Sequence, residues 1–181
     1  MRDHSRDIIP AMEDLISLFD CDDCLRLNDG LAAAILDLRD EDYARRSHWF
    51  QGRYENLYID VARLPGLELI LQTGLSKAAT RLAMPEKELK LGFWLNIMRK
   101  GDVTTLHRHD DDDELLSAVY YVQADEHSAL FRLHAQGKVK EVIPVAGRFM
   151  FFDPALPHEV LPQRADQARI SIGINFGPAI E

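Results

Sequence analysis

Long apolar runs are absent from this sequence of 181 residues, and nothing in it has the form of a signal peptide or a membrane-spanning helix. The first residues, Met1 to Asp7, mix charges of both signs and lead into no apolar segment. We therefore expect a cytoplasmic protein that does not enter a membrane.

Cysteine is scarce, since only Cys21 and Cys24 occur. A single C-x-x-C pair lacks the second ligand pair of a structural zinc site, and cytosolic proteins usually keep such thiols reduced. The pattern weighs against a metal or redox role, and whether the pair has any role stays open. No Gly-x-Ser-x-Gly turn occurs and neither cysteine lies in a motif with a histidine, which disfavours nucleophilic hydrolysis.

Positive charge is also in short supply, because the formal net charge is −9. Such a chain repels nucleic-acid phosphates and anionic lipid surfaces. We therefore expect a small-molecule or peptide substrate as the partner, and no nucleic acid.

The length and the globular composition, with 46% hydrophobic and 28% charged residues, predict one domain over residues 1–181. Residues 1–85 are expected to form a helical support region, with helices at Ile8 to Phe19, Asp29 to Leu38 and Gly66 to Leu82. The last is apolar enough to pack against a sheet. The N-terminal helices could also supply the face of a homodimer.

Residues 86–181 change to short β-branched and aromatic runs separated by turn residues, which is typical of an antiparallel β unit. Eight such runs predict a double-stranded β-helix, or jelly roll, so the fold class is mainly β with N-terminal helices. The expected strands are Leu91 to Met98, Thr104 to His107, Leu116 to Val122, Ala129 to His134, Val139 to Ile143, Arg148 to Phe152, His158 to Leu161 and Ala168 to Phe176.

The last expected strand alternates between two kinds of residue. Ile170, Ile172, Ile174 and Phe176 fall on one face, and Arg169, Ser171, Gly173 and Asn175 fall on the other. One face is therefore apolar, and Arg169 on the other either meets solvent or lines a polar cavity.

The motif His107-Arg-His109 carries the clearest chemistry. Residues two apart on a strand point to the same side, so two imidazoles can converge on one metal ion. His158 follows a proline-rich turn at the start of a later strand and is the natural third ligand. Three such ligands leave open positions on an octahedral Fe(II).

Several segments together resemble the Fe(II)/2-oxoglutarate-dependent oxygenases, particularly a small bacterial branch. The resemblance covers about Phe93 to Phe176, nearly half of the chain. Its segments occur in a characteristic order: Trp94 to Gly101, His107-Arg-His109, Leu116 to Val122, Gly147 to His158, and Arg169 to Phe176. It implies an enzyme that uses Fe(II), 2-oxoglutarate and O2 to hydroxylate its substrate.

The resemblance also implies where the cosubstrate binds. The interval of eleven positions from His158 to Arg169 is similar to the family's interval between its distal metal-binding His and the Arg that pairs with 2-oxoglutarate. A guanidinium suits a carboxylate because it donates two parallel hydrogen bonds. Ser171 would add a hydroxyl donor, and Asn96 and Tyr120 or its neighbour Tyr121 are expected to line the pocket.

One metal ligand departs from the commonest family pattern, which has His-x-Asp where His107-Arg-His109 stands. The shifted triplet His109-Asp110-Asp111 would make Asp111 the anionic ligand instead. We prefer His107, His109 and His158, because the small bacterial branch also has the His-x-His pair. The remaining acids of the run from Asp110 to Glu114 are expected to form a solvated loop.

Two other classes of function stay open. Gly101, His107, His109 and Glu114 match most of the first cupin metal motif, with Glu114 as a fourth ligand, although Tyr121 stands where that motif has Gly. A cupin could be a dioxygenase, an isomerase or a ligand-binding module that does not use 2-oxoglutarate. A metal-free binding protein on the same scaffold is the third class.

The substrate itself is not specified by the sequence. The segment from Ser47 to Asn56 is rich in groups that can contact a polar ligand. It precedes the barrel, where such folds often place a substrate loop. Arg53 and Trp49 are the substrate-binding candidates there, against the simpler interpretation of an ordinary turn with an anchoring Trp.

Overall fold

The computed structural model describes residues 15–109 and 113–179. Two antiparallel sheets form the framework of this part of the chain. The larger sheet has seven strands in the order β1-β9-β6-β11-β4-β3-β2, and the smaller has four in the order β5-β10-β7-β8. The strands are β1 (Ile16–Asp20), β2 (Arg45–Phe50), β3 (Arg53–Tyr58), β4 (Leu89–Met98), β5 (Thr104–His107), β6 (Leu116–Gln123), β7 (Phe131–Ala135), β8 (Lys138–Val142), β9 (Arg148–Phe152), β10 (His158–Val160) and β11 (Arg169–Pro178).

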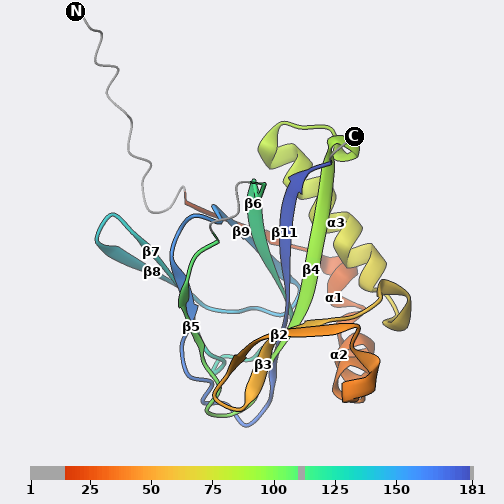
Figure 1. Ribbon diagram of the computed structural model, residues 1–181, viewed down its shortest axis with the longest axis vertical. Helices are drawn as coiled ribbons and strands as arrows, with labels where there is room; N and C mark the ends of the chain where they lie inside the picture. Colours follow the sequence, from red (N-terminus) through yellow and green to blue (C-terminus); the bar gives the residue numbers. More distant parts are fainter. Residues whose placement is uncertain (1–14, 110–112, 180–181) are drawn as a thin grey trace, which may run out of the picture.

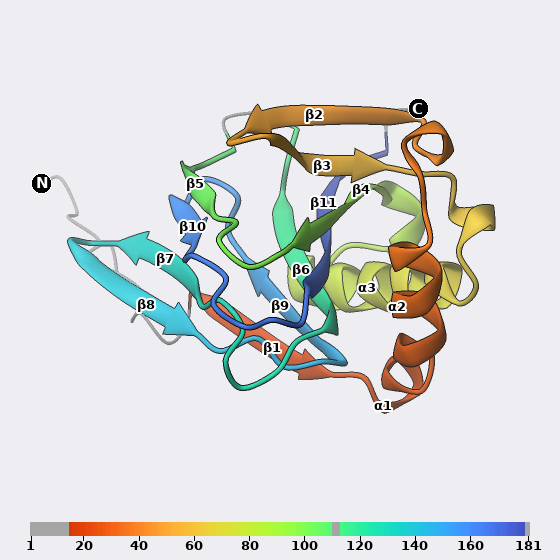
Figure 2. The same ribbon diagram turned by 90° about the horizontal axis from the view of Figure 1, so that it is seen from below.

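The helices lie on the outer face of the larger sheet, away from the smaller sheet, as Figures 1 and 2 show. They are α1 (Asp22–Leu25), α2 (Asn28–Leu36) and α3 (Leu67–Leu82), with three short 3-10 helices at Asp40–Asp42, Val61–Arg63 and Glu86–Glu88. The buried side of α3 presents Leu67, Ile70, Leu71 and Ala78 to the main hydrophobic core. Burying that side stabilises the helix more than its intrinsic propensity does.

The main core lies between the helices and β11. Ile170, Ile172, Ile174 and Phe176 are fully buried in it, as their alternation along the strand predicts. A second, smaller core lies between the two sheets and includes Tyr121, Phe131, Leu133 and Phe152. A layer of side chains thus lies between the two sheets. The fold is the expected mainly β double-stranded β-helix.

The prediction of a purely helical region over residues 1–85 is wrong, because β1, β2 and β3 lie there. The expected helix from Ile8 to Phe19 lies partly outside the described residues, and its described end is strand. Ile16–Asp20 pairs antiparallel with β9, with Leu18 opposite Met150. Apolar spacing that is compatible with a helix is overridden here, because the edge of β9 offers a ladder of hydrogen bonds.

The two cysteines form a disulfide, contrary to the expectation of reduced thiols. Cys21 follows β1 and Cys24 lies in α1, and both are buried in the main core. The backbone N–H of Cys21 also donates to the carbonyl oxygen of Gly147. The bridge therefore joins the end of an edge strand to the first helix. Within the described residues, no helix combines the length and hydrophobicity needed to cross a membrane.

Candidate metal and cosubstrate site

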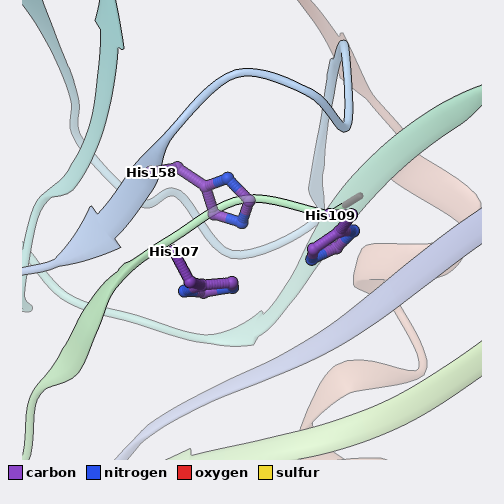
Figure 3. Close-up of side chains that lie close together, drawn as sticks. All are labelled: His107, His109 and His158. Carbon is purple, nitrogen blue, oxygen red and sulfur yellow. The ribbon is translucent and has the colours of Figure 1, made fainter. Parts of the chain in front are cut away.

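Three imidazoles meet at one end of the smaller sheet. His107 ends β5 and His158 begins β10, and these two residues face each other in the register of the two paired strands. His109 follows β5, where its backbone N–H donates to the carbonyl oxygen of Pro154. One ring nitrogen of each histidine lies within 4.8 Å of the others, and Figure 3 shows the three rings around one point.

The other ring nitrogens explain this orientation. Nδ1 of His107 lies 2.7 Å from the carbonyl oxygen of Thr105, and Nδ1 of His158 lies 2.8 Å from that of Leu156. A carbonyl oxygen only accepts hydrogen bonds, so both Nδ1 atoms carry the proton and both Nε2 atoms keep a lone pair. Such outer hydrogen bonds hold metal-binding imidazoles in position. The pair is therefore arranged to coordinate a metal through Nε2.

His158 is held in its neutral form. Burial, and next the nearby His107, lower its pKa to about 3. The rings of Phe131 and Phe152 pack against it, with centroids 5.5 Å and 4.9 Å from its own. A neutral imidazole is the form that binds a metal ion, so no proton has to leave this residue at neutral pH.

A cavity of about 440 Å³ opens beside the three histidines, between the two sheets. Its size lies within the usual range for small-molecule sites. The residues that line it come from both sheets and from the β2–β3 hairpin. They include His48, Glu55, Asn56, Tyr58, Trp94, Asn96, Thr104, His107, His109, Glu114, Ser117, His158, Arg169, Ser171 and Asn175.

Arg169 lines this cavity and is only 1% exposed. Burial lowers the pKa of its guanidinium, and the neighbouring Tyr121 opposes that shift. The cation lies 5.1 Å from the centre of the Tyr121 ring and donates to Ser171 Oγ over 3.2 Å. Its Nε has no hydrogen-bond partner among the described residues. A buried cation with an unused donor is suited to an anionic ligand.

Three more buried polar atoms on the cavity wall also have no hydrogen-bond partner within the described part of the chain. They are Thr104 Oγ1, Asn96 Oδ1 and Glu55 Oε1. Buried polar groups without partners are uncommon in native proteins and usually mark a bound ligand or water. Of the groups on this wall, Arg169, Ser171 and the Thr104 hydroxyl can donate hydrogen bonds, and these donors suit the far carboxylate of a dicarboxylic acid.

The structure brings most of the predicted site residues to one cavity. Arg169, Ser171 and Asn96 line it with the three histidines, but Tyr120 does not. The Tyr120 hydroxyl points into the main core and donates to Asn28 Oδ1 over 2.7 Å. Its neighbour Tyr121 points the other way, toward Arg169, because consecutive strand residues face opposite sides. The choice of Tyr120 for the cosubstrate pocket was therefore wrong.

The two substrate-binding candidates do not line the cavity. Arg53 donates to the carbonyl oxygen of Val103 over 2.8 Å and lies 3.5 Å from Glu55, so it anchors the hairpin. Trp49 is 62% exposed and packs edge-on against Tyr54. The same hairpin instead contributes His48, Glu55, Asn56 and Tyr58 to the lining.

Glu114 differs from both expectations made for it. Its side chain is only 18% exposed, and its Oε2 lies 2.7 Å from His109 Nδ1. It is thus neither part of a solvated loop nor, in this structure, a fourth member of the histidine cluster as the cupin alternative requires. Asp111, the alternative ligand, lies outside the described residues. Sequence reasoning also missed Thr104, Asn175 and Trp94 as lining residues, although Asn175 shares the polar face of Arg169.

Comparison with known proteins supports the same assignment. Residues 93–177 match the family model of the 2OG-Fe(II) oxygenase superfamily. A prolyl-4-hydroxylase from Pseudomonas putida is similar in structure, with a TM-score of 0.67 and 22% identity over 92% of this chain and 94% of that one. An oxidoreductase of the 2OG-Fe(II) oxygenase family from Burkholderia pseudomallei has a TM-score of 0.66 and 17% identity, over 91% and 86% of the two chains.

A prolyl hydroxylase from Trichoplax adhaerens, in complex with a peptide fragment of hypoxia inducible factor, has a TM-score of 0.62 and 14% identity, over 90% of this chain and 83% of that one. No curated protein matches the chain in sequence. These structural likenesses establish a shared fold, and the family match spans β5, β10 and β11, on which the cavity is built. The chain accordingly matches the superfamily of 2-oxoglutarate- and Fe(II)-dependent oxygenases over residues 93–177, the part that carries the three histidines and Arg169.

Proposed function

We propose that this enzyme hydroxylates a small-molecule, amino-acid or peptide substrate in the cavity between its two sheets. Its superfamily uses Fe(II), 2-oxoglutarate and O2. In our proposal His107, His109 and His158 hold the iron, and Arg169, Ser171 and Asn96 bind 2-oxoglutarate. The observation that carries the proposal is the convergence of three imidazoles and one buried arginine on a single cavity.

Bound iron would activate O2, the oxidant, and 2-oxoglutarate would supply two electrons through its decarboxylation to succinate, so that one oxygen atom could enter a C–H bond of the substrate. The chain's own residues bind and orient. His107 and His158 present Nε2 because backbone carbonyls hold their Nδ1 protons. Arg169 offers a fixed, desolvated positive charge to the cavity, and Ser171 supports it. The aliphatic and aromatic side chains around His158 exclude water from the part of the cavity where the metal would bind.

The polar groups of the lining fall into two sets. Arg169, Ser171 and Thr104 carry donors that suit a carboxylate, and the β2–β3 hairpin contributes His48, Glu55, Asn56 and Tyr58. In our proposal the cosubstrate contacts the first set and the substrate meets the second. The likeness to prolyl hydroxylases, one of them bound to a peptide, favours an amino-acid or peptide side chain as the target.

Anaerobic titration with Fe(II) and then 2-oxoglutarate tests this proposal, with the visible charge-transfer band of the chelate as the readout. We expect a band in the wild type that needs both additions. His158→Ala should lose it because iron no longer binds. Arg169→Ala should bind iron normally but need about 100-fold more 2-oxoglutarate, as befits the loss of a buried charge-assisted pair.

Arg132→Ala is the matched control, since Arg132 lies on β7 and pairs with Glu141 away from the cavity. It should behave like the wild type. Iron binding without any response to 2-oxoglutarate would favour the cupin-type alternative, a metalloprotein that does not use this cosubstrate. Failure of the wild type to bind iron would contradict both.

A further inference from the structure

The three histidines differ in what holds their outer nitrogen. His107 and His158 each donate from Nδ1 to a neutral backbone carbonyl. His109 instead has its Nδ1 at 2.7 Å from the Glu114 carboxylate. A carboxylate accepts only, so His109 donates its Nδ1 proton and keeps the lone pair of Nε2 available for a metal. One ring of the three is therefore backed by an ionic group.

Glu114 is held in place by side chains from two strands. Asn175 Nδ2 on β11 donates a short hydrogen bond to Glu114 Oε1, and Ser117 Oγ on β6 donates to Asn175 Oδ1 over 3.0 Å. Ser117 and Asn175 face each other in the register of the two paired strands. The side chains of His109 and Glu114 are only 15% and 18% exposed. The pair is thus oriented by the sheet and largely shielded from water.

The backbone around Glu114 is anchored as well. The N–H of Leu115 donates to the carbonyl oxygen of Phe176 over 2.8 Å, and Lys90 pairs with Asp113 at 2.8 Å. A side chain at Gly177 would collide with the carbonyl oxygen of Asp113, with 2.2 Å between that oxygen and an added Cβ. The absence of a side chain at position 177 therefore permits the close approach that brings Glu114 to His109.

Among the described residues, the cluster that could hold a metal consists of three imidazoles and includes no carboxylate. Position 109 is where the commonest family pattern has an aspartate. We propose that Glu114 is a positioning residue that restores this charge one step away from the metal, through its hydrogen bond to His109. The inference rests on the proposed iron site and concerns how that site tolerates histidine at position 109.

The chemical reason lies in ligand basicity. A carboxylate behind an imidazole fixes the ring and makes its far nitrogen a stronger donor, and removing such a partner typically lowers metal affinity about 10- to 100-fold. Glutamine at position 114 would keep the size and an acceptor oxygen but remove the charge. Glu114→Gln is therefore the informative change.

Glu159→Gln is a matched control, because Glu159 lies 3.0 Å from His134 Nε2 in a similar carboxylate–imidazole pair that does not line the cavity. We would measure Fe(II) affinity by anaerobic titration and record the visible spectrum of the Co(II)-loaded protein, with thermal unfolding to verify folding. Glu114→Gln should weaken Fe(II) binding about 10- to 100-fold and shift the Co(II) bands. Glu159→Gln should change neither.

His109→Asp separates a charge effect from a purely structural one. In that background the anion is a direct ligand, so Glu114→Gln should cost less than threefold in Fe(II) affinity. An equal loss in both backgrounds would show that Glu114 only supports the fold, and would overturn the inference. A Glu114→Gln protein with wild-type Fe(II) affinity and an unchanged Co(II) spectrum would also overturn the inference. The proposed function would stand in either case, provided that the wild-type protein binds iron. A wild type that binds no iron would overturn both.

Discussion

The two faces of the larger sheet have opposite roles, although they are made by the same strands. On β11 the outward residues Ile170 and Ile172 are buried beneath the helices, and the inward residues Arg169 and Ser171 line the cavity. On β6 Tyr120 points outward and Tyr121 inward. The helix-covered face is packed and apolar, and the cavity face keeps polar atoms without protein partners. Consecutive residues of one strand therefore have different roles: those on one face stabilise the fold, and those on the other line the cavity.

This separation can be tested most strongly on the outer face. Phe149 is fully buried there, against Tyr120 and next to α3, with ring centroids of the two aromatics 4.6 Å apart. Phe149→Ala should lower the free energy of unfolding by about 3–5 kcal/mol, because it removes apolar contacts and leaves a cavity. Urea unfolding measures the loss. At temperatures where the variant is folded, Fe(II) and 2-oxoglutarate affinities should equal those of the wild type, and a weakened site would contradict the separation.

Substitutions at one glycine on each face test the same difference with a smaller expected change in stability. An added Cβ at Gly173, on the cavity face, would lie 2.4 Å from the Trp94 indole, whereas one at Gly74 in α3 would lie 3.3 Å from the edge of Phe149. Gly173→Ala should destabilise the protein by about 1–3 kcal/mol through overpacking and alter tryptophan fluorescence. Gly74→Ala should change stability by less than about 1 kcal/mol, because better helix propensity offsets the tight contact. Equal losses of stability in the two variants would contradict the difference between the two faces.

The adjacent tyrosines give the smallest effects and the sharpest comparison. Tyr120→Phe removes the buried hydrogen bond to Asn28 and should cost about 1–2 kcal/mol of stability, with 2-oxoglutarate affinity unchanged. Tyr121→Phe removes a hydroxyl near Arg169 and should weaken 2-oxoglutarate binding about threefold to tenfold, with little change in stability. Thermal unfolding and the anaerobic titration measure the two effects. The reverse assignment of effects would show that our placement of the faces is wrong.

Local patterns predicted much of this molecule. The alternation along β11 separated its two faces correctly, and the helix at Leu67–Leu82 and the strands at Thr104–His107 and Arg148–Phe152 were found at or within one residue of their bounds. These features depend on nearest neighbours along the chain. The strand β1 was missed because its partner β9 is remote in the chain. The hairpin of β2 and β3 was missed because its residues do not alternate strongly between buried and exposed.

The site shows the same division. The His-x-His motif indicated two ligands on one side of a strand, and the resemblance to a family indicated His158 and Arg169. The expectation for Tyr120 was wrong, because the pairing of β6 with β11 places Tyr121, and not Tyr120, opposite Ser171. The contact between Glu114 and His109 was not foreseen either, because it depends on Asn175, which lies 61 positions further along the chain and holds the carboxylate.

The sequence by itself determined the fold class, the apolar face of β11 and the pair of imidazoles at 107 and 109, because side-chain direction along a strand follows from spacing alone. Only the tertiary structure decided that His158 faces His107 across paired strands, that Arg169 is buried in the same cavity, and that Glu114 stands behind His109. The physical reason is that spacing states which side of a strand a residue occupies, whereas strand pairing and packing decide what lies opposite it.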